Sequence, residues 1–176
     1  MDSTLIFALQ VTVSLIVYGL VARWYIAPRL ATLALPAALR PLLLLHLLRT
    51  MGAAFVVPAI VGSPLPADFA IPGMVGDLIA VALAAAALVA LGGRWRHALA
   101  LVWVFNIAGT LDFLFAFWQG ARLAVPSDYH LGAAWFIPNF FVPAFLVAHL
   151  LIYRLLLTRA QEYRSYRPPV SLADPA

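Results

Sequence analysis

The sequence predicts an all-α integral membrane protein, a helical bundle with five transmembrane helices. Of its 176 residues, 65% are hydrophobic and 10% are charged, and the mean hydropathy is +0.98. Soluble domains are about 45–50% apolar and about 25% charged, so a soluble fold is excluded. At ~20 apolar residues per span, the chain holds about five spans with short connections. The predicted location is the bacterial plasma (inner) membrane.

The first predicted span runs from Thr4 to Leu20. It ends in an interfacial belt of Arg23, Trp24 and Tyr25, where aromatic rings and a charge favour the lipid headgroup level. The following stretch, Pro28–Pro36, is apolar but is bracketed by prolines. It also contains Arg29, and we therefore expect it to be an interfacial connection.

The second predicted span covers Ala37–Val61, and Pro58 should bend its far end. A loop rich in proline and glycine is expected from Gly62 to Gly76. The third span, Asp77–Leu91, is short and rich in alanine, and Asp77 is placed to cap its N-terminus.

The fourth span is expected from Trp95 to Trp118, after the Gly92–Gly93 break, and the fifth from Gly132 to Leu157. Residues 1–158 then form one transmembrane domain. Residues 159–176 form a polar cytoplasmic tail, which we expect to fray after Thr158. Its charged and proline residues are Arg159, Glu162, Arg164, Arg167 and Pro168–Pro169.

Arginine placement orients the predicted bundle. One side collects nine of the eleven basic residues: Arg23, Arg29, Arg40, Arg94, Arg96, Arg154, Arg159, Arg164 and Arg167. The other side has Arg122 with four acids: Asp2, Asp68, Asp77 and Asp128. By the positive-inside rule, the N-terminus lies outside and the C-terminus in the cytoplasm.

The composition excludes several chemistries. The chain has no cysteine, which excludes iron–sulfur clusters and thiolate sites. All eleven basic residues are arginine, so retinal and pyridoxal phosphate have no lysine to bind. The basic residues lie at predicted helix ends, which argues against nucleic acid as a partner. Hydrolase and nucleotide-binding motifs are absent, which favours a non-enzymatic protein.

Two histidines are expected at one depth inside the bundle. His46 lies six residues below Arg40 on the second span, and His149 lies five below Arg154 on the fifth. At ~1.5 Å per residue, both imidazoles lie about 8–9 Å inside the arginine layer. Facing imidazoles at equal depth are typical of a membrane haem b site, with each histidine as an axial metal ligand. The alternatives are a chlorin, a divalent metal, a quinone or purely structural polar packing.

Other polar residues extend this candidate pocket. Asn139, His149 and Tyr153 share one face of the fifth span, whereas His46, Arg49 and Ala53 share a face of the second. Asn106, Gly109 and Asp112 form a row on the fourth, where Gly109 allows close approach of a neighbouring helix.

Arg49 and Asp112 form a candidate ion pair across the bundle. Their predicted depths differ by about 9 Å, which the long arginine side chain mostly closes. The pair either neutralises itself and fixes the helix register, or lines the pocket of an anionic or amphiphilic ligand.

The stretch from Leu45 to Leu156 resembles a group of small uncharacterised bacterial inner-membrane proteins. The resemblance is carried by four segments: HLLRTMG (46–52), GDLIA (76–80), VWVFNIAGTLDFLFAFWQG (102–120) and GAAWFIPNFFVP (132–143). It implies a five-span membrane protein and brings no activity, cofactor or catalytic residue with it.

We therefore expect a membrane protein that binds a hydrophobic or amphiphilic cofactor in an intramembrane polar pocket, with haem b as the sharpest candidate. The pocket residues are His46, Arg49, Asn106, Asp112, Asn139, His149 and Tyr153. The alternatives are an accessory subunit of a larger membrane complex and a small-solute carrier. The expected partners are the lipid bilayer and another membrane protein or a second copy of the chain.

Overall fold

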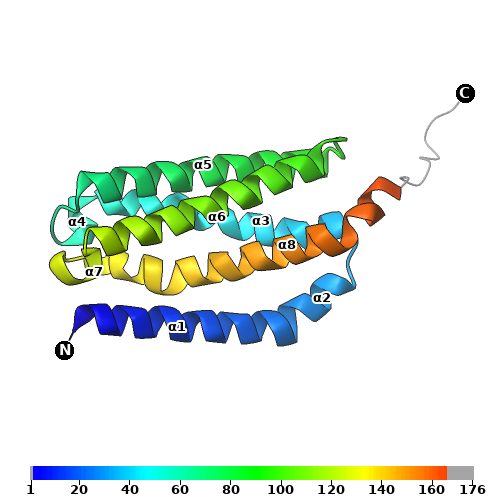
Figure 1. Cartoon of the computed structure of the whole chain (residues 1–176). Coiled ribbons are helices and arrows are strands. Elements are labelled where there is room, and N and C mark those ends of the chain that lie inside the picture. Colours follow the sequence, from blue (N-terminus) through cyan, green and yellow to red (C-terminus); the bar gives the residue numbers. More distant parts are fainter. Residues whose placement is uncertain (1, 166–176) are drawn as a thin grey trace, which may run out of the picture.

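The computed structural model describes residues 2–165, and within them the chain is helical without any strand (Figure 1). The α-helices are α1 (Ser3–Val21), α2 (Ala27–Ala31), α3 (Leu35–Leu45), α4 (Pro58–Val61), α5 (Ala67–Gly92), α6 (Ala98–Arg122), α7 (Val125–Asp128) and α8 (Val142–Ser165). Two π-helical segments, Ala22–Ile26 and Ile137–Phe141, and two 3-10 segments, His46–Val56 and Gly132–Trp135, continue or join them.

Five of the resulting helical runs are long and apolar enough to cross a membrane. They are Ser3–Ala31, Leu35–Val56, Ala67–Gly92, Ala98–Arg122 and Gly132–Tyr163. The predicted all-helical fold with five potential spans is therefore confirmed.

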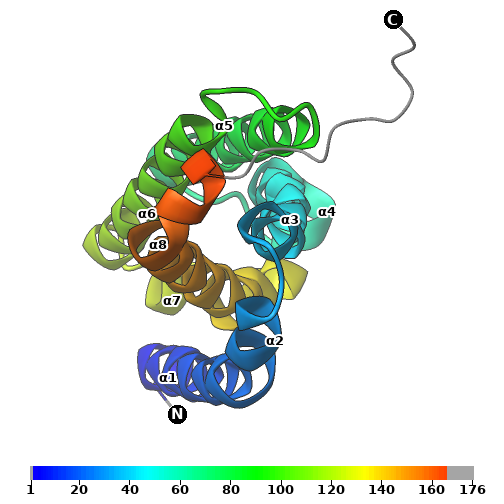
Figure 2. The same ribbon diagram turned by 90° about the vertical axis from the view of Figure 1, so that its right-hand side faces the viewer.

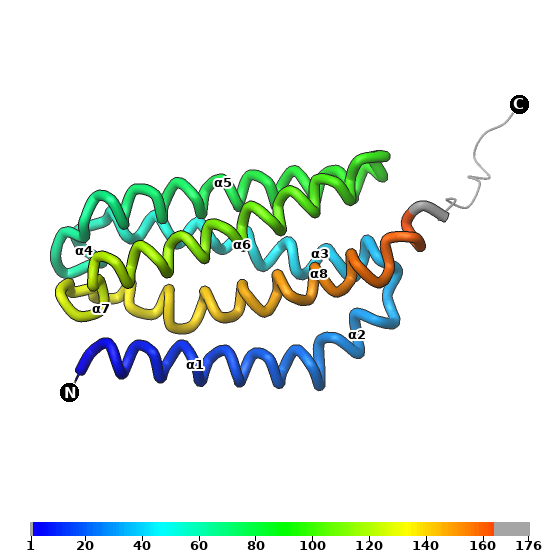
Figure 3. The backbone as a smooth tube through the Cα atoms, viewed as in Figure 1, coloured from blue at the N-terminus to red at the C-terminus, as the bar shows by residue number. Residues whose placement is uncertain are grey.

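The five runs alternate in direction, so the bundle has two distinct ends (Figures 1 and 3). The α2–α3 turn, the α5–α6 turn and the C-terminal end of α8 lie at one end, which we call the arginine-rich end. Five of its arginines are Arg29, Arg40, Arg94, Arg96 and Arg159. The start of α1, α4 and α7 lie at the other end, which we call the proline-rich end.

The first run is longer than predicted because Pro28 does not end it. A proline ring clashes with the carbonyl four residues earlier and removes one helical hydrogen bond. The chain absorbs this with the π-helical segment Ala22–Ile26 and then continues as α2 through Ala31. The predicted connection Pro28–Pro36 is therefore too long: its first four residues belong to α2, its last two to α3, and Thr32–Ala34 joins the two helices.

The third run begins ten residues before its predicted start. The loop predicted over Gly62–Gly76 ends at Pro66, and α5 passes straight through Pro72. Pro72 has no N–H to donate to the carbonyl of Asp68, and the Gln119 side-chain amide of α6 donates to that carbonyl instead, at 2.8 Å. Asp77 therefore lies in the middle of α5 and is not an N-cap.

The last run also extends beyond its predicted end. Fraying after Thr158 was expected, but α8 stays helical to Ser165. Arg159 pairs with Glu162 at 2.7 Å and donates to the carbonyl of Leu33 at 2.7 Å, which ties α8 to the α2–α3 turn. The rest of the predicted tail, with Arg167 and Pro168–Pro169, lies outside the described residues.

The two ends of the bundle have different cores. Small residues line α5 toward the arginine-rich end, where Ala84, Ala87 and Ala90 are completely buried among leucines of α3 and α8. Toward the proline-rich end, the core contains Phe55 and Ile137 and is built on shorter helical segments. Because alanine adds little bulk, helices approach closely in the first region.

Helix α1 lies at the edge of the bundle. Viewed along the helix axes, it stands apart from the other long helices, beside α8 and α7 (Figure 2). In the most apolar stretch of its run, Ser3–Ala31, only 11% of the residues are buried, whereas in that of the last run 50% are buried. A hydrogen bond adds to its packing on α8 and α7: the indole N–H of Trp135 donates to the side-chain carbonyl of Gln10 at 2.7 Å.

Candidate functional site

The site begins with the unusual 3-10 segment His46–Val56. A 3-10 helix has three residues per turn, so residues three apart lie on one line. His46, Arg49, Gly52 and Phe55 are spaced in this way, and all four are buried. In an α-helix the first and last of them would point to opposite sides, because nine residues span two and a half turns. The predicted shared face of His46 and Arg49 is confirmed, and Gly52 replaces Ala53 as its next member.

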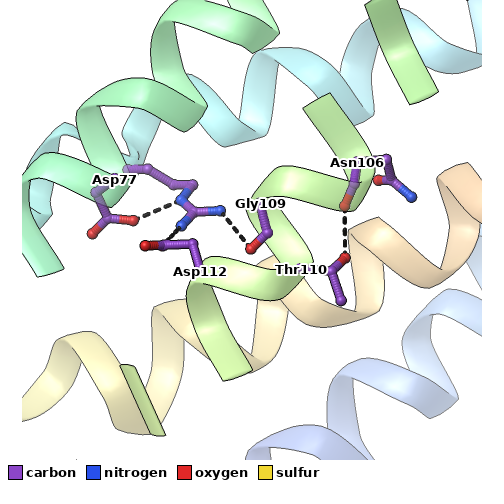
Figure 4. A network of polar contacts seen from close by, with 6 residues as sticks. Asp77, Asn106, Gly109, Thr110 and Asp112 are labelled. Carbon is purple, nitrogen blue, oxygen red and sulfur yellow. Dashed lines mark hydrogen bonds and ion pairs between the residues drawn. The ribbon is translucent and has the colours of Figure 1, made fainter. Parts of the chain in front are cut away.

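Arg49 is the centre of a polar layer halfway along the bundle. Its guanidinium is completely buried, its Nε donates to Asp77 Oδ1 of α5 at 2.6 Å, and its Nη2 donates to Asp112 Oδ2 of α6. Its Nη1 donates to the carbonyl of Gly109 at 3.3 Å. Figure 4 shows the two carboxylates reaching toward the same point from α5 and α6.

The predicted pairing of Arg49 with Asp112 is confirmed, whereas the part played by Asp77 was missed. The proline and glycine residues before Asp77 suggested a loop, which turned an intramembrane acid into an apparent helix cap. The signal that could have found it is the requirement for charge compensation, because a buried arginine attracts every carboxylate within reach. The predicted pairing with Asp112 already compensated the charge of Arg49, so the sequence offered no reason to look for a second acid.

Three glycines make room for the charged side chains. A Cβ on Gly52 would overlap the Asp77 carboxylate, and one on Gly76 would overlap the carboxylate of Asp112. A Cβ on Gly109 would lie 2.9 Å from both Arg49 Nη1 and His149 Nε2. The predicted close approach at Gly109 is therefore confirmed. Gly52 and Gly76, on the other two helical runs of the layer, leave space for side chains in the same way.

The two histidines lie together on the other side of Arg49, toward the arginine-rich end. The ring centroids of His46 and His149 are 4.2 Å apart, and both side chains are buried. Phe105 and Phe145 enclose the pair, each within 5.4 Å of the His46 ring centre. Among residues 2–165, neither nitrogen of His46 has a hydrogen-bond partner, and His149 Nε2 has none either.

A small network fixes the orientation of His149. Its Nδ1 donates to the Asn106 side-chain carbonyl at 2.6 Å, and the Asn106 amide donates to the main-chain carbonyl of His149 at 3.2 Å. The Tyr153 hydroxyl donates to the main-chain carbonyl of Asn106 at 3.2 Å. Asn139 stands apart from this network: it is buried, but its amide donates to the carbonyl of Trp135 in its own helical run.

The histidine pair does not fit a haem in this arrangement. A bis-histidine haem places iron between two ring nitrogens and a flat macrocycle between the two rings. His46 and His149 are in direct contact with each other, and Phe105 stacks on the His149 ring at 5.3 Å. No layer of space separates the rings. For a single metal ion the donor set is small, since no group of three or more potential ligands occurs within residues 2–165.

A cavity of about 370 Å³ lies between the polar layer and the proline-rich end. Its walls come from α1, α5, α6, α7 and the π-helical segment Ile137–Phe141, and they are mainly phenylalanine, alanine and glycine. The aromatic residues are Phe7, Phe55, Phe69, Phe113 and Phe117. Asp77 and Asp112 are its two acidic wall residues, and their side chains keep 11% and 17% of their surface exposed.

Electrostatically, this arrangement is unbalanced toward negative charge. One guanidinium faces two carboxylates, so the layer carries one excess negative charge when both acids are ionised. Arg49 is sealed behind the carboxylates, and Phe113 covers its guanidinium at 3.8 Å. The cavity therefore meets acids at its polar end and not the arginine. A cation or a proton would balance the excess negative charge of such a site.

The family model described as "Domain of unknown function (DUF8737)" matches residues 6–157. The comparison with curated proteins finds no match, and neither does the comparison with solved structures.

Proposed function

The chain belongs to the DUF8737 family, whose description names no activity, and we propose that it is a multi-pass membrane protein that binds a small amphiphilic ligand within the bundle. The observation that carries the proposal is the cavity of about 370 Å³ that ends at Asp77 and Asp112. Ligand pockets are mostly apolar with a few polar groups at defined places, and they start at about 300 Å³. This cavity has that composition and size.

The polar layer supports a binding role because it is expensive to maintain. A buried arginine and two carboxylates cost several kcal/mol in a bilayer unless each charge is compensated. Gly52, Gly76 and Gly109 provide the space that these side chains need. A purely structural bundle would obtain similar stability from apolar residues. Asp77 and Asp112 line the cavity, so contact with a ligand would explain why these acids are present.

The proposal includes an orientation, taken from the arginine count. The arginine-rich end lies in the cytoplasm of a bacterial inner membrane, and the proline-rich end, with the cavity, lies in the outer half of the bilayer. The ligand then enters from the periplasmic side or from the outer leaflet. Helix α1 contributes Thr4, Phe7 and Ala8 to the cavity wall and is the least enclosed of the five runs.

Photolabelling of the purified protein in lipid nanodiscs tests this proposal. The probe is 3-azioctanol, a small neutral amphiphile, and labelled residues are located by peptide mass spectrometry. We expect label on cavity residues such as Phe113 and Phe117, which are not exposed, and loss of that label in Ala116→Trp, which fills the cavity. The matched control is Leu111→Trp on the exposed side of α6, which should label normally. Label confined to exposed residues, or unchanged in Ala116→Trp, would refute the proposal.

A further inference from the structure

We infer that the ligand of this cavity is a single-chain amphiphile with a positively charged head group, such as an alkylammonium ion. The inference rests on the proposed function and narrows it to one chemical class. It starts from three features of the cavity: the charge at its polar end, the aromatic lining and the volume.

The charge at the polar end favours a cation. Asp77 and Asp112 share one guanidinium, so the ionised layer has one uncompensated negative charge. An uncompensated charge in a low-dielectric site is costly, and a bound cation removes that cost. The Arg49 side chain, in contrast, has no exposed surface. An anionic head group would meet two carboxylates before it reached the guanidinium.

The aromatic lining also favours a cation with an apolar body. The faces of phenylalanine rings attract cations within about 6 Å, and their bulk accommodates alkyl groups. Phe113 is already covered by Arg49 at 3.8 Å. Four further phenylalanines are available to the ligand: Phe7, Phe55, Phe69 and Phe117. Neutral hydrogen-bonding side chains are scarce among the wall residues, where Thr4 and Ser127 provide the hydroxyls.

The volume selects a small ligand. At about 370 Å³, the cavity is near the lower limit for sites that hold drug-sized molecules. It suits one short alkyl chain with its head group and not a lipid with two acyl chains. A free alkylammonium ion and the ammonium group of phosphatidylethanolamine share the head-group chemistry, and the cavity volume favours the free amphiphile.

Competition against 3-azioctanol labelling tests the charge preference. Three competitors have the same ten-carbon chain: decyltrimethylammonium, decanol and decanoate. In phosphatidylcholine nanodiscs, we expect half-maximal competition by decyltrimethylammonium at a concentration at least tenfold below that of decanol, with decanoate weakest. Replacing a third of the lipid with phosphatidylethanolamine should leave the labelling unchanged, because its ammonium group carries two acyl chains with it. A loss of labelling there would contradict the single-chain assignment.

Two variants assign the preference to the carboxylates. Asp77→Asn and Asp112→Asn each keep the shape of the side chain and a carbonyl acceptor for Arg49. The measured quantity is the half-maximal competing concentration of decanol divided by that of decyltrimethylammonium. Each variant should reduce this ratio at least fivefold. Asp68→Asn is the matched control, since it removes an exposed acid from the same helix α5 outside the cavity wall. An unchanged ratio in both cavity variants, or stronger competition by decanoate in the wild type, would overturn the inference. Because decanol and 3-azioctanol are neutral, their binding would survive that outcome and the proposed function with it.

Discussion

The two halves of the bundle belong to the same five helical runs but differ in helix geometry and in their cores. Toward the arginine-rich end, α5 presents completely buried alanines to its neighbours, and they pack in a core of leucine, isoleucine, valine and phenylalanine side chains. Toward the proline-rich end, π-helical and 3-10 segments, prolines and phenylalanines leave a cavity. Arg49 and its partners lie where the two regimes meet.

Irregular backbone is concentrated beside the polar layer and the cavity in this protein. Inside a membrane, non-regular helix is tolerated where it is buried in protein or lines a cavity. Here the irregular segments His46–Val56 and Ile137–Phe141 lie beside the polar layer and the cavity. Another irregular segment of a long run, Ala22–Ile26, accommodates Pro28 near the arginine-rich end and does not line the cavity. Substitutions of Arg49, Gly109, Gln119 and the two histidines test this division between the two halves.

Arg49→Met should have the largest effect. It leaves two largely buried carboxylates without their shared cation, and breaking a buried ion pair from one side costs about 3–5 kcal/mol. The free energy of unfolding in mixed micelles, from titration with a denaturing detergent, measures the loss. Arg154→Met, which removes an exposed arginine from α8, should cost less than about 0.5 kcal/mol.

A triple variant separates charge from shape in this experiment. Arg49→Met combined with Asp77→Leu and Asp112→Leu removes all three charges, and it should recover most of the lost stability. If the triple variant were as unstable as Arg49→Met alone, the layer would be held by its geometry and not by charge compensation.

Gly109→Ala should be the next most damaging change. The new methyl group would lie 2.8 Å from His149 Cε1 and 2.9 Å from Arg49 Nη1, and overpacking of this kind costs about 1–3 kcal/mol. Gly19→Ala in α1 is the matched control, because nothing lies within 4 Å of its new methyl group. Thermal unfolding should show a lower midpoint for the first variant and an equal or higher one for the second. Equal midpoints would show that the polar layer is loosely held.

Gln119→Leu tests how the proline-rich half tolerates a proline inside α5. It removes the donor that satisfies the Asp68 carbonyl beside Pro72, at a cost of about 1–2 kcal/mol. Pro72→Ala restores a main-chain N–H to α5, so Gln119→Leu should cost clearly less in that background. A double-mutant cycle on the free energy of unfolding measures this coupling, and strict additivity of the two changes would contradict the account.

The histidine pair should give the smallest effect, and the two members should differ in sign. His46 is buried, and neither ring nitrogen has a partner in the described part of the chain, so His46→Leu should be neutral or stabilising by up to about 1 kcal/mol. His149→Leu should destabilise by about 1 kcal/mol, because the Asn106 side-chain carbonyl loses its donor. Parallel unfolding curves test the sign. Destabilisation by His46→Leu equal to that by His149→Leu would indicate a partner for His46 that these contacts do not include.

Most of the fold could be predicted from the sequence because hydropathy and helix length are local properties. The five runs follow from long apolar stretches, and the arginine-rich end follows from counting charges between them. The errors cluster at prolines. From the local sequence, Pro28 and Pro72 are expected to break a helix. In the folded chain, the π-helical segment Ala22–Ile26 compensates for Pro28, and the Gln119 side chain of α6 compensates for Pro72. Such compensation is tertiary and has no local signal.

The site was predicted in part for the same reason. The rise per residue of a helix gives the depth of each residue in the membrane. Equal depths predicted that His46 lies close to His149, and the small difference in depth predicted the pairing of Arg49 with Asp112. Asp77 was lost with the misplaced start of α5. Asn139 shares the predicted stripe with His149, yet its hydrogen bond stays within its own run. The cavity could not be predicted, because it depends on which helices are neighbours.

The central claim is that the cavity and the two carboxylates form one cation-binding site. Its most direct test is the rise in unfolding temperature caused by decyltrimethylammonium, since a ligand that binds only the folded state stabilises it. Wild type, Asp112→Asn, Ala116→Trp and the double variant are compared in nanodiscs, with Asp68→Asn as control. We predict that each single change removes most of the rise, that the double variant loses no more, and that the control keeps it. Losses that add in the double variant, or an equal loss in Asp68→Asn, would contradict a single site.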